Sequence, residues 1–258
     1  MKYFYLAFDS DFFNHINEGR VAEGKPESKL FNILSVLLKK NVVSVPLIIF
    51  ETFIAFVLWL PIPIYSSLVY RIVNRARGMP HYHGMYLRAL YYRFRLKRMS
   101  PNVFVDQNVI FAFPSSVSLK KFCYIDKNAI IMAKSAHIGE RVHICPYAFI
   151  SGGGHFIAKD FSCVCAKALI LTSSEALKHG SRASGPMAKA SERLVVRGHV
   201  TVEKDAFVGA GSIILPNVTV GEGSIIAAGA TVTKSTKPWS ITGSGKSSVI
   251  GYREPVKY

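Results

Sequence analysis

A six-residue repeat is the feature of this sequence that most constrains its fold. From Val196 onward the chain divides into VRGHVT, VEKDAF, VGAGSI, ILPNVT, VGEGSI, IAAGAT and VTKSTK. The leading aliphatic residues are Val196, Val202, Val208, Ile214, Val220, Ile226 and Val232, and the fifth positions are small or β-branched. A period of six fits neither a helix nor an alternating strand. It predicts short parallel strands wound around a triangular core, with each leading aliphatic pointing inward.

The same frame returns upstream with less regularity. It is carried by Ile125, Ile131, Ile138, Ile144, Ile150, Ile157, Val164 and Ile170, with some steps of seven residues. Between Leu171 and Pro186 the repeat is interrupted by a polar stretch, LTSSEALKHGSRASGP. We therefore predict a mainly β fold, with a parallel β-helix over residues 101–240 that contains an excursion loop at 172–194. Residues 241–258 are expected to form a closing segment.

The first hundred residues have a different character and are predicted to form a helical, membrane-associated region. The segment Val42–Tyr70 carries one charge, Glu51, and is long enough to cross a bilayer. It contains three prolines and has basic residues on both sides, so we expect a re-entrant or interfacial hairpin rather than a straight span. The alternative is a soluble arrangement, in which these helices are buried against the β-helix or between subunits.

A basic stripe follows, in the segment MYLRALYYRFRLKRM. Its cations are Arg88, Arg93, Arg95, Lys97 and Arg98, and no acidic residue occurs between Glu51 and Asp106. The chain as a whole carries a formal charge of +16, which indicates an anionic partner. Because the stripe adjoins an apolar run, it favours an anionic membrane surface, and a nucleic-acid partner is not expected.

The stretch VGAGSIILPNVTVGEGSIIAAGATVTK resembles the hexapeptide-repeat acyltransferases, most closely the O-acetyltransferases of bacterial surface polysaccharides. The resemblance extends from about residue 102 to about residue 250. It implies a left-handed parallel β-helix, assembly as a homotrimer, and acetyl-CoA and acceptor bound between neighbouring β-helices. The small residues that it places along the pantetheine arm are Gly209, Ala210, Gly211 and Ala228. Thr233 and Lys234 match the Thr-Lys pair of the family, and Lys246 is the candidate for a further phosphate contact.

Transfer of an acyl group to a sugar hydroxyl needs a general base. Many relatives have a histidine just after the equivalent of Thr172, where this chain has Glu175. Since Ile150 and Ile170 should share a corner, His155 and Glu175, each five residues further on, are predicted to stack on successive rungs as a dyad. His179, inside the excursion loop, is the rival base. We expect the acceptor to contact Ser173, Ser174 and Arg182.

These features predict a membrane-associated enzyme that moves an acetyl group from acetyl-CoA to a sugar hydroxyl in surface polysaccharide biosynthesis. Its expected location is the cytoplasmic face of the bacterial inner membrane, with a sugar or lipid-linked glycan as acceptor. The alternatives are an N-acetyltransferase acting on a nucleotide-linked or lipid-linked amino sugar, and a non-catalytic membrane-tethered scaffold.

A β-helical carbonic anhydrase is disfavoured because it needs two histidines five residues apart, and no pair of the eight has that spacing. The cysteines Cys123, Cys145, Cys163 and Cys165 lack zinc-ribbon spacing. We expect them to be reduced core or ladder residues, and no metal is predicted.

Overall fold

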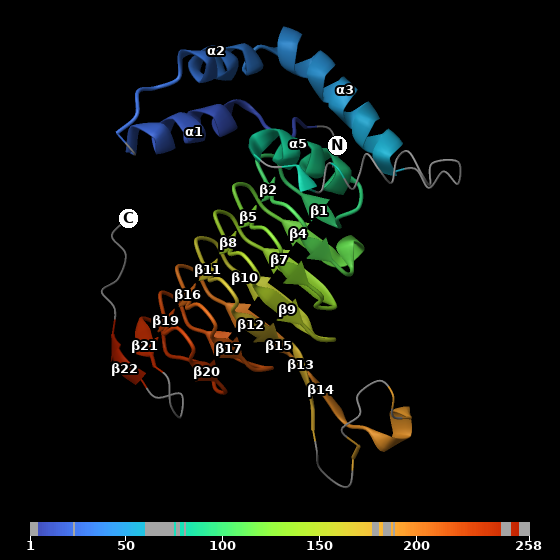
Figure 1. Ribbon diagram of the computed structural model, residues 1–258, viewed down its shortest axis with the longest axis vertical. Helices are drawn as coiled ribbons and strands as arrows, with labels where there is room; N and C mark the ends of the chain where they lie inside the picture. The colour runs from blue at the N-terminus through green and yellow to red at the C-terminus, as the bar shows by residue number, and fades with distance from the viewer. Residues whose placement is uncertain are drawn as a thin grey trace.

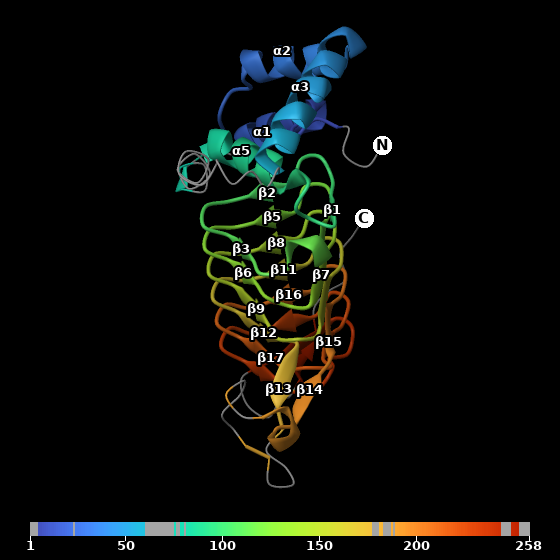
Figure 2. The ribbon, with the colours of Figure 1, turned by 90° about the vertical axis from the view of Figure 1, so that its right-hand side faces the viewer.

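The computed structural model describes residues 5–22, 24–59, 75, 78–79, 81–176, 181–182, 187, 189–243 and 249–252. Helices gather at one end of a long β-solenoid, and a hairpin projects from the solenoid near its other end (Figures 1 and 2). The helices are α1 (Ser10–Ala22), α2 (Lys29–Leu38), α3 (Asn41–Trp59) and α5 (His81–Arg93), with short 3-10 turns at Pro114–Ser116 and Ala190–Glu192.

Three parallel sheets form the walls of the solenoid. Sheet A contains β1 (Arg98–Met99), β4 (Val117–Leu119), β7 (Ser135–Ile138), β10 (His155–Ala158), β15 (His199–Val202) and β18 (Thr219–Val220). Sheet B contains β2 (Phe104–Val105), β5 (Tyr124–Ile125), β8 (His143–Ile144), β11 (Cys163–Val164), β16 (Phe207–Val208), β19 (Ile225–Ile226), β21 (Ser240–Thr242) and β22 (Val249–Tyr252). Sheet C contains β3 (Ile110–Phe111), β6 (Ile130–Ile131), β9 (Phe149–Ser151), β12 (Leu169–Leu171), β17 (Ile213–Ile214) and β20 (Thr231–Val232). The chain visits A, B and C in turn, so the predicted mainly β solenoid is confirmed, with about 7 turns.

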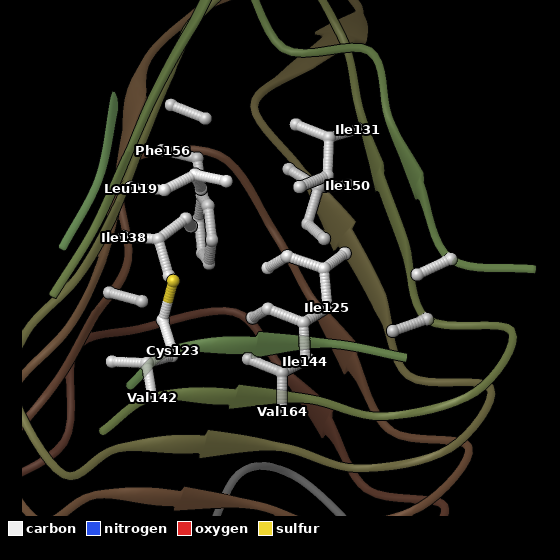
Figure 3. Packing of buried hydrophobic residues seen from close by; sticks show 14 of the residues in the cluster. Leu119, Cys123, Ile125, Ile131, Ile138, Val142, Ile144, Ile150, Phe156 and Val164 are labelled. Carbon is white, nitrogen blue, oxygen red and sulfur yellow. The ribbon is translucent and has the colours of Figure 1, made fainter. Parts of the chain in front are cut away.

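The hexad pattern produces this core because each rung places its aliphatic residue above the one before. Ile150 pairs with Ile131 on one side and Ile170 on the other, and the same register continues to Ile214. Figure 3 shows Ile125, Ile144 and Val164 stacked in this way inside the solenoid. These side chains are fully buried, and burying each stabilises the fold by about 1.5–3 kcal/mol relative to leaving it exposed.

Two aliphatic residues that the repeat predicts to point into the core do not do so. Ile157 is only partly buried, because the seven-residue step turns it outward and places Phe156 and Ala158 in the core instead. Val196 is 41% exposed, because it belongs to a hairpin outside the solenoid.

That hairpin consists of β13 (Ser173–Glu175) and β14 (Val195–Arg197), which pair antiparallel with each other and with no coil strand. The excursion therefore continues through Arg197 instead of ending at residue 194. The coil resumes at His199, where β15 pairs with β10. At the far end of the chain β22 folds back antiparallel on β21.

Two buried arginines anchor helix α5, Arg93 to helix α3 and Arg88 to the first coil. Arg93 lies 3.0 Å from the Glu51 carboxylate, which also accepts hydrogen bonds from the Ala7 N–H and the Tyr86 hydroxyl. Arg88 donates to the Val105 carbonyl and lies 3.4 Å from Asp106. Both arginines are 1% exposed. The prediction that they face lipid headgroups is therefore wrong, because each compensates a carboxylate inside the protein.

Helix α3 is long and apolar enough to cross a membrane, with a mean hydropathy of 2.3 and only 17% of that window buried. Residues 60–74, the remainder of the predicted hairpin, lie outside the described residues. The membrane association expected from the sequence stays a prediction.

Candidate functional site

The hairpin leaves and re-enters the solenoid at the corner between sheets C and A. We call this place the exit corner; it is formed by Gly152–Gly154, Thr172 and Gly198. A Cβ atom on Gly154 would stand 2.0 Å from the Gly198 carbonyl oxygen and 2.3 Å from that of Thr172. The three backbone segments can approach this closely only because the crossing residue is glycine.

Two hydroxyls at the base of the hairpin hold the exit corner together. Thr172 Oγ1 accepts a hydrogen bond from the Gly154 N–H at 3.1 Å and donates one to the Ser151 carbonyl at 2.9 Å. Ser173 Oγ accepts from the Gly153 N–H at 2.9 Å. The predicted acceptor contact Ser173 therefore has a structural partner within the corner.

His155 begins β10 directly beside the exit corner, on the outer face of sheet A. Its Nδ1 atom lies 2.7 Å from Ser135 Oγ on the preceding rung. On the following rung its ring stacks against His199, with centroids 4.8 Å apart and an angle of 14° between the planes. These two neighbours fix the orientation of the imidazole.

Burial lowers the pKa of His155, and the adjacent charges of His199, Lys134 and His137 lower it further. The lowered pKa favours the neutral form of the imidazole. A neutral, oriented imidazole with a solvent-facing edge can take a proton from an acceptor hydroxyl or ammonium group. This chemistry makes the exit corner the candidate active site.

The predicted stacking of Glu175 on His155 is wrong. Ile150 and Ile170 share a corner as expected, but the chain then leaves the coil, and Glu175 pairs with Val195 inside the hairpin. The position beside His155 is occupied by His199, which follows the excursion. One carboxylate oxygen of Glu175 is buried and has no hydrogen-bond partner among the described residues.

The remaining residues predicted for the loop are dispersed. Ser174 is exposed on the hairpin, and Arg182 pairs with Glu192 at 3.3 Å within the excursion. His179 and the cofactor candidate Lys246 lie outside the described residues. Their proposed roles stay predictions.

The predicted cofactor residues lie on two different corners. Gly209, Ala210 and Gly211 form the turn from sheet B to sheet C, directly beside the turn that contains Ala228. Ala210, Gly211 and Ala228 are exposed, so this corner presents a flat column of small residues. Thr233 and Lys234 follow β20 and are exposed on the corner between sheets C and A, three coils along from β9. Within one subunit the outer face of sheet C separates the two groups.

A basic groove of about 1320 Å³ runs along the corner where sheet A turns into sheet B. We call it the lysine groove. Its cationic lining residues are Lys97, Arg98, Lys120, Lys121, Lys159 and Lys204. His137, on strand β7 of sheet A, also lines the groove. Glu140 also lines the groove, and four of its lysines pair with carboxylates: Lys120 with Asp160, Lys121 with Asp11, Lys159 with Glu203 and Lys204 with Asp205. A groove with this many lysines suits a phosphorylated ligand.

The sequence interpretation missed Ser135, His199 and Arg197 as members of the site. Arg197 packs over Gly153, because a Cβ there would meet its Nε at 3.0 Å. For His199 the missing information was the length of the excursion, because His199 pairs with His155 where the coil resumes. Ser135 lies on the rung before His155, ahead of the excursion, so counting rungs could have found it.

Comparison with known proteins finds similarity to acyltransferases. Residues 199–234 match the family described as bacterial transferase hexapeptide (six repeats). The dTDP-4-amino-4,6-dideoxy-D-glucose acyltransferase of Escherichia coli is 25% identical over 147 residues, 56% of this chain and 76% of its own length. A chloramphenicol acetyltransferase of Agrobacterium fabrum is 36% identical over 56 residues, 22% of this chain and 27% of its own.

Among solved structures, a variant of the N-acyltransferase AntD from Bacillus cereus superposes with a TM-score of 0.59. It is 25% identical and the match covers 63% of this chain and 87% of AntD, which was solved with dTDP-4-amino-4,6-dideoxyglucose and coenzyme A. The resemblance to hexapeptide-repeat acyltransferases is thus confirmed. The similar proteins include acyltransferases acting on sugars.

Proposed function

We propose that this chain is an acyltransferase that moves an acyl group from acyl-CoA to a sugar, with His155 as general base at the exit corner. The observation that carries the proposal is the position of His155. It is oriented by Ser135 and His199, held neutral by its surroundings, and adjacent to a hairpin that interrupts an otherwise regular solenoid.

Acetyl-CoA is the proposed donor. Coenzyme A is bound in AntD structures, and the small exposed residues Ala210, Gly211 and Ala228 leave a pantetheine arm free access to the backbone. Lys234 is exposed on the corner shared with the hairpin, where it can meet a CoA phosphate.

The proposed acceptor is a sugar hydroxyl. This group needs a base such as His155, because a neutral hydroxyl is a poor nucleophile unless a base removes its proton. A sugar amine is the second candidate, favoured by the similarity to acyltransferases of dTDP-linked amino sugars. The lysine groove supports a phosphorylated carrier for either sugar, whether nucleotide or lipid.

A role in surface polysaccharide synthesis at the cytoplasmic face of the bacterial inner membrane belongs to the same proposal. It is supported by apolar residues exposed on the helices: Leu30, Ile33 and Val36 on α2, and Val42, Val45, Ile49 and Phe53 on α3. The proposed homotrimer is supported by the outer face of sheet C. There Ile110, Ile130, Phe149, Leu169 and Ile213 occupy successive rungs and are all incompletely buried.

The test is release of free thiol from acetyl-CoA by the detergent-purified chain with matched nucleotide-linked acceptors. One acceptor carries an amino group on the sugar, and the other carries a hydroxyl at the same carbon. Turnover that requires the hydroxyl sugar supports O-acyl transfer, and turnover that requires the amino sugar assigns the second candidate. Absence of turnover with both, and with a lipid-linked glycan extract, would contradict the proposal.

A further inference from the structure

Three cysteines and a histidine gather on the outer face of sheet B, away from the exit corner. His143 and Cys163 are register partners on β8 and β11. Cys145 and Cys165 each follow two residues later, so the two rungs present an H-x-C pair beside a C-x-C pair. Residues two apart on a strand lie on the same face, and adjacent rungs are about 4.8 Å apart. The four side chains therefore form a cluster on two adjacent rungs.

Three distances within this cluster match those around a single tetrahedral ion, while Cys165, which contacts Cys163, lies outside the set whose ligand atoms are all within 4.8 Å of one another. Cys145 Sγ lies 3.8 Å from Cys163 Sγ, Cys163 Sγ lies 3.8 Å from Cys165 Sγ, and Cys145 Sγ lies 3.5 Å from His143 Nδ1. Zinc binds sulfur at about 2.3 Å and nitrogen at about 2.0–2.1 Å, which separates two tetrahedral ligands by about 3.8 Å for S···S and about 3.5 Å for S···N. His143, Cys145 and Cys163 have their ligand atoms within 4.8 Å of one another.

The second nitrogen of His143 has the partner that a metal-binding histidine usually has. Its Nε2 atom lies 3.3 Å from Asp126 Oδ2, while Tyr124 stacks on the ring with centroids 5.0 Å apart. Asp126 is itself held by the Lys127 N–H at 2.7 Å. A carboxylate on the far nitrogen fixes the histidine tautomer, leaving Nδ1 free to bind metal.

We propose that His143, Cys145 and Cys163, with Cys165 as the fourth ligand, form a structural zinc site. Thiolate-rich tetrahedral coordination selects zinc over the hard cations, and a closed four-ligand site is structural rather than catalytic. The ion joins adjacent rungs of the solenoid, β8 and β11. Cys123 is a fully buried core residue, and Cys145, Cys163 and Cys165 are partly buried residues on the outer side of the ladder.

The spacing explains why the sequence concealed this site. Zinc ribbons and fingers place two ligands on one tight turn, at C-x₂₋₄-C spacing. A solenoid instead brings ligands together from consecutive coils, so a pair spaced by one residue on each rung is sufficient.

The experiment uses the full chain, reduced and stripped with a chelator, and titrated with Co²⁺ and then Zn²⁺. We expect one equivalent of Co²⁺ to produce tetrahedral d–d bands and sulfur-to-cobalt charge-transfer absorption, and Zn²⁺ to abolish both. Cys163→Ala should remove the charge-transfer absorption, while the matched control Cys123→Ala, whose thiol lies in the core, should retain it. Asp126→Asn should weaken zinc binding about 10–100-fold, the usual effect of losing such a partner.

The contrasting explanation is a reactive thiolate. Contacts with Cys163 and then His143 lower the pKa of Cys145 to about 5, which also favours modification of this sulfur. Wild-type protein that binds neither Co²⁺ nor Zn²⁺ stoichiometrically, or whose Cys145 is alkylated at the same rate with and without zinc, would overturn the proposal. Metal binding is measured without acyl-CoA, so the result is independent of the proposed transferase activity.

Discussion

At the scale of single residues, the candidate base is controlled by its neighbours on the adjacent rungs. His155 acts as a base only when neutral, so its activity is lost as pH falls through its pKa. Because that pKa is lowered, the acid limb of the rate profile should lie below the ordinary histidine value of about 6.5.

Replacing His199, which stacks on His155, should shift the acid limb of the pH profile to higher pH. In His199→Ala the charge and part of the burial that lower the pKa of His155 are removed, so the limb of kcat/KM is expected at higher pH than in the wild type. The measurement is the pH profile of acyl transfer, with His83→Ala in helix α5 as the control. An unchanged limb in His199→Ala would show that the stacking does not tune the base.

At the scale of elements, the exit corner depends on how the hairpin is anchored to the coil. The fully buried Thr172 hydroxyl satisfies the Gly154 N–H and the Ser151 carbonyl. Thr172→Val keeps the shape but leaves both groups without this partner, so the free energy of unfolding should fall by about 1–3 kcal/mol. The check is a urea denaturation series beside Ser174→Ala, an exposed position of the same hairpin. Equal stabilities for the two variants would mean that the hydroxyl does not secure the corner.

The solenoid was predictable because every rung needs an aliphatic side chain that points inward. Each hexad of the sequence supplies one, such as Ile214 or Val220. The site was less predictable, because the excursion changes which residue follows His155. Counting residues placed Glu175 there, whereas hydrogen bonding between rungs places His199. Sequence spacing cannot reveal where a chain that has left the coil returns to it.

The burial of Arg88 and Arg93 was hidden for a similar reason. Their carboxylate partners Asp106 and Glu51 are 18 and 42 residues away, so a stripe rich in arginine and tyrosine indicated a surface. Packing of α5 on α3 brings Arg93 to Glu51, and packing of α5 on the first coil brings Arg88 to Asp106.

At the scale of the whole molecule, Glu51 on α3 holds the helical region together, and α5 joins that region to the solenoid through Arg88. The Glu51 carboxylate is 2% exposed and pairs with Arg93. Glu51→Ala leaves a buried arginine without its partner, so we expect a loss of about 3–5 kcal/mol in the free energy of unfolding. Glu27→Ala, at an exposed glutamate, is the matched control for thermal and urea unfolding in detergent. A loss no greater than that of the control would contradict the buried linkage.

One measurement tests whether His155 is the general base for acyl transfer at the exit corner. Acceptor-dependent thiol release from acetyl-CoA is compared for wild type, His155→Gln and the control His83→Gln on helix α5. Removal of a general base should lower kcat about 10²–10⁴-fold in His155→Gln, with the fold intact and His83→Gln close to wild type. A folded His155→Gln variant that turns over at the wild-type rate would contradict the account.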